Sequence, residues 1–137
     1  MTNGAVTSSF REGYANIDII SHSWGTTLTY DLQNNSGIET HNWVTMGSVL
    51  KKSTDKPLGI KGNWINYSSP YDPAYYAALY PPFPGGIVSL GSLGANVHSD
   101  RNVDFPREHH MGHWGIPEHG AYWDDSYVLN DLRLQLK

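Results

Sequence analysis

Short runs in which apolar and polar residues alternate are the feature that most constrains the fold of this chain. In NDLRLQLK, near the C-terminal end, Leu132, Leu134 and Leu136 would share one face of an extended strand. The run TTLTYDL repeats this alternation, and the turn-forming residues NNSG follow it. The two runs predict half-buried strands, the second of which ends in a hairpin turn.

Other short runs combine β-branched and aromatic residues and are separated by Gly, Pro, Asn and Asp. They are ANIDII, HNWVTMGSVL, GNWINYSS and GGIVSLGSL. Only DPAYYAALY favours a helix, with Asp72 as its cap and Pro73 in its first turn. The sequence therefore predicts an all-β fold, an antiparallel β-sandwich that forms a single domain over residues 1–137.

Composition excludes several classes of function. The chain has 137 residues and no cysteine, which excludes a disulfide framework, a thiolate metal site and a cysteine nucleophile. Its formal net charge is −4, so we expect no nucleic-acid partner. No segment approaches the roughly 18–20 apolar residues of a membrane span, and the first residues lack a signal-peptide pattern. We expect a soluble protein, cytoplasmic or released.

The stretch REHHMGHWGIPEHGAYWDD is rich in histidines and carboxylates and permits two interpretations. His109, His113 and His119, with nearby carboxylates, could bind zinc or another divalent metal in a His/Asp metal-dependent enzyme. Because glycines and a proline interrupt the stretch, a polar loop with no metal is the other interpretation. The serines give only weak support for an acyl-transfer site, since G-x-S-x-G does not occur and GSLG around Ser92 is the nearest imitation.

Tyrosines and prolines are concentrated between Trp64 and Phe83. Amphipathic rings suit surfaces that are apolar on one side and wet on the other, such as membrane interfaces, cation sites and sugar platforms. The alternative is that these rings fill the core and its edges. We expect a surface that displays them to a ligand.

Two parts of the chain resemble membrane-lipid-binding families. YSSPYDPAYY resembles the S-x-P-Y-D segment of actinoporins, while NIDIISHSWGTTLTYD and MGSVLKKSTDKPLGIKGNWINY resemble aegerolysins. Both families share a cytolysin-like β-sandwich. The actinoporin resemblance implies a phosphocholine headgroup site at Ser68, Pro70, Tyr71, Asp72 and Tyr76. Unlike an actinoporin, the chain opens with a polar, glycine-broken segment, so pore formation by this chain alone is not expected.

We therefore expect a non-catalytic protein that binds a membrane lipid headgroup or a carbohydrate, alone or as the recognition component of a pore-forming toxin. No cofactor is expected in this interpretation. The alternatives are a lectin for a neutral glycan and the metal-dependent enzyme described above. The expected ligand-binding residues are Trp64, Ser68, Pro70, Tyr71, Asp72, Tyr75, Tyr76, Trp114 and Trp123.

Overall fold

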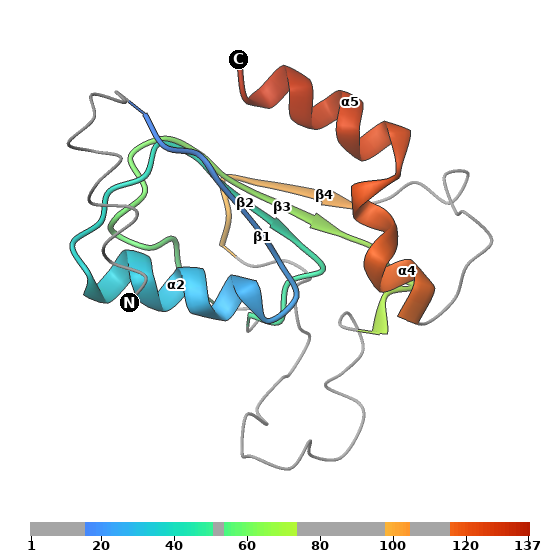
Figure 1. The fold of residues 1–137 in the computed structure, drawn as a ribbon, viewed down its shortest axis with the longest axis horizontal. Helices are drawn as coiled ribbons and strands as arrows, with labels where there is room; N and C mark the ends of the chain where they lie inside the picture. The colour runs from blue at the N-terminus through green and yellow to red at the C-terminus, as the bar shows by residue number, and fades with distance from the viewer. Residues whose placement is uncertain (1–15, 51–53, 74–97, 105–115) are drawn as a thin grey trace, which may run out of the picture.

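The computed structural model describes residues 16–50, 54–73, 98–104 and 116–137, and it shows a parallel β-sheet covered by helices (Figure 1). The strands are β1 (Ile19–His22), β2 (Trp43–Met46), β3 (Trp64–Ser68) and β4 (Arg101–Asp104). They lie in the order β1-β2-β3-β4, and each neighbouring pair is parallel. The prediction of an all-β antiparallel sandwich is therefore wrong, since the protein has an α/β architecture.

Helices lie on both faces of the sheet (Figure 1). Helix α2 (Gly25–Asn35) connects β1 to β2 and lies on one face. On the other face lie α4 (Ile116–Gly120), the 3-10 helix η3 (Ala121–Trp123) and α5 (Ser126–Gln135). No helix in these described ranges is long and apolar enough to cross a membrane.

Burial on both faces explains the composition of the central strands. Val44 and Met46 pack toward the α5 side with Ile65, whereas Trp43 and Trp64 form a second cluster on the α2 side. The two indole rings stack with their centroids 4.8 Å apart. Strands of a parallel sheet covered on both faces are nearly continuous apolar runs, and the buried polar residues Thr45 and Asn66 of the central strands bond to each other at 2.8 Å. The strands predicted in HNWVTMGSVL and GNWINYSS are confirmed, ANIDII contributes only its last two residues to β1, and GGIVSLGSL lies outside the described residues.

The segment TTLTYDL is helical in α2 and is not a strand. The buried residues of α2 are Thr26 and Gln33, and Tyr30 between them packs against the cluster that contains Trp43. These three residues are separated by four and three positions, which is the spacing of one face of a helix. Leu28, one of the residues that suggested alternation, is 74% exposed. The hydroxyls of Thr26 and Thr29 bond to the carbonyls of the preceding turn, which lets these β-branched residues fit a helix.

The segment NDLRLQLK is also helical, in α5. Asp125 caps its first turn, since its carboxylate accepts hydrogen bonds from the backbone of Tyr127 and Val128 at 2.8 and 3.0 Å. Val128 and Leu132 contact the sheet one turn apart, whereas Leu134 is exposed. The alternating leucines therefore do not share one buried face.

An ionic cluster fixes α5 to the sheet. Arg101 donates two hydrogen bonds to the carboxylate of Asp131, at 2.6 and 2.9 Å, and the hydroxyl of Tyr67 donates a third at 2.6 Å. The bonds from Arg101 lower the pKa of Asp131, and burial raises the pKa of Tyr67. The cluster joins β3, β4 and α5.

Candidate functional site

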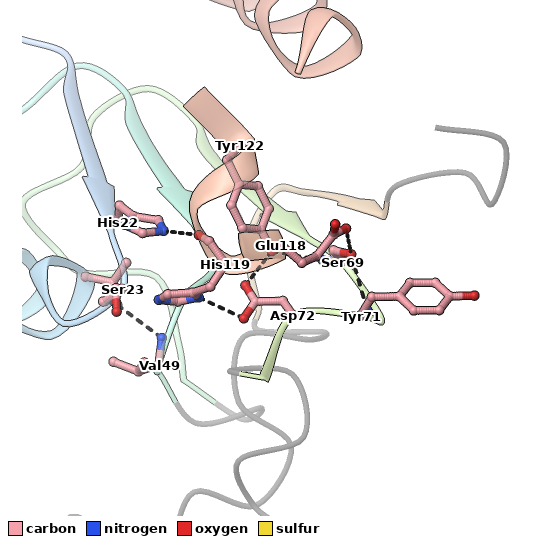
Figure 2. Close-up of polar contacts among 10 residues, drawn as sticks. His22, Ser23, Val49, Ser69, Tyr71, Asp72, Glu118, His119 and Tyr122 are labelled. Atoms are coloured by element: carbon pink, nitrogen blue, oxygen red, sulfur yellow. Dashed lines mark hydrogen bonds and ion pairs between the residues drawn. The ribbon is translucent and has the colours of Figure 1, made fainter. Parts of the chain in front are cut away.

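The candidate site lies where the carboxyl ends of three strands meet α4 and η3 (Figure 2). This edge is the usual position of ligand sites in open α/β sheets, because the loops that follow parallel strands gather there. Five residues from four separate parts of the chain form the candidate site, because α4 and η3 follow each other directly. They are Ser23 after β1, Gly47 after β2, Asp72 after β3, His119 in α4 and Tyr122 in η3.

Ser23 occupies a strained turn between β1 and α2. Its φ is 52°, and it is the only non-glycine residue with a positive φ in the parts of the chain described above. Such a conformation costs about 1–3 kcal/mol and is concentrated at functional sites. Its N–H donates to Met46 O at 3.1 Å, and its carbonyl accepts from the hydroxyl of Thr26 at 2.6 Å. The fold therefore holds this serine in an unfavourable conformation at the start of a helix.

Asp72 and His119 form a close pair. Nδ1 of His119 lies 2.7 Å from Oδ1 of Asp72, whose side chain is only 1% exposed. Because an ionised carboxylate only accepts, Nδ1 must carry the proton. In a neutral ring, Nε2 is then free of a proton and can act as a base. Asp72 thus fixes the tautomer and the orientation of the imidazole.

Tyr122 holds the other oxygen of the same carboxylate. Its hydroxyl donates to Oδ2 of Asp72 at 2.7 Å and accepts from the backbone N–H of Ser69 at 3.1 Å. Burial, followed by the charge of Asp72, raises the pKa of Tyr122 well above its usual value, so it stays protonated as a donor. Both oxygens of Asp72 are therefore bonded to groups from the segment that carries His119.

A second contact joins the turn after β3 to α4. The hydroxyl of Ser69 donates to Oε1 of Glu118 at 2.6 Å, and both side chains are buried. The backbone N–H of Tyr71 bonds to the same Ser69 oxygen at 3.2 Å. The turn that carries Asp72 is thus tied to the residue before His119, which limits movement of the two partners relative to each other.

Gly47 makes room for this pair. A Cβ atom at position 47 would lie 2.7 Å from Oδ2 of Asp72 and 3.1 Å from two atoms of the His119 ring. Its φ is also positive, at 52°. Both the backbone conformation and the close approach therefore require glycine.

The His119 ring lies between Ser23 and Asp72 (Figure 2). Its Nδ1 edge is bonded to Asp72, and its opposite edge faces Ser23. Among the described residues, the Ser23 hydroxyl makes no hydrogen bond to His119. Bonds between a nucleophile and its base are often long without substrate and shorten when substrate binds. The three side chains lie in the order Ser, His, Asp, as in a Ser-His-Asp site, and the contact that is formed is the one between His119 and Asp72.

The backbone N–H of Trp24, next to Ser23, is a candidate donor for a developing oxyanion. Trp24 follows the serine and is the N-cap of α2. The first N–H groups of a helix have no partner inside the helix, and the positive end of the helix dipole favours negative charge there. In strand–turn–helix serine sites, the N–H of the residue after the serine stabilises the oxyanion.

The structure distributes the predicted ligand residues differently from the sequence prediction. Trp64 is buried against Trp43, and its indole N–H bonds to Thr45 at 3.0 Å. Ser68 is buried at the end of β3, whereas Pro70 and Tyr71 are half-buried in the turn that follows. Trp123 is 46% exposed beside the site, and Tyr75, Tyr76 and Trp114 lie outside the described residues.

The proposed metal ligands are only partly described. His119 bonds to Asp72, while His109 and His113 lie outside the described residues, as does most of the predicted helix over DPAYYAALY. Within the described ranges, no group of three or more His, Asp or Glu side chains could hold a metal ion. His119 is thus placed as a partner of a carboxylate.

Sequence reasoning missed Ser23, although the signal was present. The residues SHSWG follow the predicted strand ANIDII and differ from G-x-S-x-G only at the first position, where Ser21 replaces glycine. Ser21 is small and buried, and its hydroxyl accepts the indole N–H of Trp43 at 2.8 Å. A small side chain therefore suffices at that position.

Comparison of the chain with protein-family models, curated proteins and solved structures returned no match. The assignment of a function therefore depends on the chemistry of the site itself.

Proposed function

We propose that this protein is a serine hydrolase that acts through an acyl-enzyme, with Ser23 as nucleophile, His119 as general base and Asp72 as the residue that orients the base. The main support is the strained strand-to-helix turn at Ser23, next to His119, which is half-buried and paired with the buried Asp72. The chain order Ser, Asp, His is that of α/β-hydrolases and differs from that of chymotrypsin and subtilisin.

The reaction follows from the positions of the protons. Nε2 of His119 takes the proton of the Ser23 hydroxyl while the oxygen attacks the carbonyl carbon of an ester or related acyl substrate. The resulting oxyanion accepts a hydrogen bond from Trp24 N–H. His119 then gives its proton to the leaving group, and water, activated by the same ring, releases the acid. Asp72 stabilises the imidazolium that forms in each step.

The hydrolase proposal now ranks above the sequence-based prediction of a non-catalytic binding protein. Binding of a lipid headgroup or a glycan remains a prediction. Of its expected ligand residues, Asp72 is committed to the His119 pair, and Tyr71 and Trp123 are the described aromatic ones that reach the surface.

The direct test is covalent labelling with a fluorophosphonate, together with hydrolysis of p-nitrophenyl acetate and butyrate. We expect one equivalent of label on Ser23, identified by peptide mass spectrometry. Ser23→Ala should lose the label and lower kcat by about 10⁴-fold or more. Ser126→Ala changes an exposed serine in α5 and serves as the control. An unlabelled wild-type protein that hydrolyses neither ester would refute the proposal.

A further inference from the structure

His22 is the residue immediately before Ser23, and its side chain contacts the proposed base. Nε2 of His22 lies 2.5 Å from the carbonyl oxygen of His119, and the two rings have centroids 4.6 Å apart (Figure 2). Since a carbonyl oxygen only accepts, Nε2 of His22 must carry the proton and donate. This hydrogen bond joins the end of β1 to α4.

The bond acts on a short helix whose position depends on its surroundings. Helix α4 has five residues, and a helix of this length has little stability of its own. His119 lies in its last turn, where carbonyl groups lose their partners within a helix. Asp72 therefore holds His119 by its ring, and His22 holds it by its backbone.

The ring of His22 is itself held by aromatic contacts. Trp123 meets it edge-on, with centroids 5.9 Å apart and an interplanar angle of 69°. Tyr122 lies 6.0 Å away on the segment that also carries Trp123. These contacts restrict rotation of the imidazole, so that its Nε2–H stays directed at the His119 carbonyl.

We propose that His22 is a positioning residue that sets the separation between Ser23 and His119. One peptide bond joins it to the nucleophile, and one hydrogen bond joins it to the backbone of the base. A displacement of about 1 Å between reacting groups can lower a rate by about 100-fold. The inference rests on the proposed hydrolase function, and it assigns to His22 no contact with substrate.

The test compares two substitutions of His22 by residues whose side-chain amides differ in length. In His22→Gln, the amide nitrogen occupies about the position of the imidazole Nε2 and can still donate to the carbonyl. In His22→Asn, the amide is one methylene shorter and cannot reach it. We expect His22→Asn to lower kcat for p-nitrophenyl butyrate, and the rate of labelling by fluorophosphonate, by about tenfold to a hundredfold. His22→Gln should stay within about fivefold of wild type, and KM should change less than twofold in both.

Thermal melts of both variants separate positioning from folding, and His98→Asn, which changes an exposed histidine before β4, is the control. A His22→Asn variant that stays folded and reacts like wild type would overturn the role of His22 and leave the hydrolase proposal standing. Equal losses in the Gln and Asn variants would also overturn it, because the donated bond would then not be what matters. A wild-type protein that is never labelled at Ser23 would overturn both proposals.

Discussion

Two His–Asp pairs in this molecule have the same geometry and different surroundings. His119–Asp72 and His98–Asp55 both join Nδ1 to Oδ1 at 2.7 Å. The first lies at the carboxyl ends of the strands, with side chains 23% and 1% exposed, whereas the second lies before β4, with side chains 63% and 85% exposed. The hydrogen-bond distance alone therefore does not distinguish a candidate catalytic pair from a surface contact.

The two pairs differ in their burial and in the residues that surround them. Water competes for an exposed pair and screens its charge, so such pairs contribute little to stability or to orientation. Asp72 is shielded from water and receives hydrogen bonds from both His119 and Tyr122, so its charge acts on the imidazole in a low-dielectric environment. A strained serine also lies beside this pair.

The largest expected difference between the two pairs is in catalysis. Asp72→Asn replaces the carboxylate by an amide that no longer requires a proton on Nδ1 of His119. The loss of the correct tautomer should lower kcat by about 10⁴-fold, as in other Ser-His-Asp sites. Asp55→Asn, the same change in the exposed pair, should leave kcat within twofold. Steady-state rates with p-nitrophenyl butyrate measure both variants, and similar losses in the two would contradict the comparison.

The next largest effect is on stability, and it concerns Tyr122, which bonds to Asp72. Tyr122→Phe removes a hydroxyl that bonds to Asp72 and to the N–H of Ser69, and it leaves both buried groups with one partner fewer. We expect the free energy of unfolding to fall by about 1–3 kcal/mol, measured by urea denaturation.

Tyr30→Phe is the matched control for that measurement. The Tyr30 ring packs against Trp43, and its hydroxyl makes no hydrogen bond to any residue in the described ranges. Its loss should change the free energy of unfolding by less than about 0.5 kcal/mol. If the two variants were equally stable, the hydroxyl of Tyr122 would not support the site.

The smallest change in stability is expected for the ion pair Arg101–Asp131. The Asp131 side chain is more exposed than Asp72 and less exposed than Asp55. The hydrogen bonds from Arg101 lower the pKa of Asp131 in the folded state. The pair therefore contributes stability above the unfolded pKa of about 3.9, and this contribution is lost as the pH falls through the lower folded value.

Asp131→Asn should consequently reduce the free energy of unfolding at pH 7 by about 1 kcal/mol and flatten its decrease between about pH 5 and pH 2. Urea melts at several pH values measure this slope, with Asp124→Asn, an exposed acid before α5, as the control. An unchanged slope in Asp131→Asn would show that the ion pair has no part in acid unfolding.

The sequence located β1, β2 and β3 but not β4, and it assigned strands to the segments that form α2 and α5. The central strands are short, apolar and rich in Trp, Val and Ile, and this composition does not depend on what covers them. In α2, by contrast, alternating leucines and tyrosine suggested a strand. The structure buries Thr26 and Gln33 instead, and polar residues give no apolar period to detect.

The candidate site was only partly predictable for a different reason. Asp72 and His119 were each singled out from the sequence, but for separate roles, as a headgroup ligand and as a metal ligand. Their pairing depends on which loops meet at the edge of the sheet, and a wrong fold class could not bring them together. Ser23 was detectable locally, provided that a small residue other than glycine is accepted two positions before it.

The strands lie in the sheet in the same order as in the sequence, which has a consequence during synthesis on the ribosome. Ser23 leaves the exit tunnel many residues before His119, and translation adds about 5–20 residues each second. For several seconds, the nascent chain carries the proposed nucleophile without the proposed base. Under the proposed function, acyl transfer would require that β4 has joined the sheet and that α4 has docked, so the chain would become reactive only when its fold is complete.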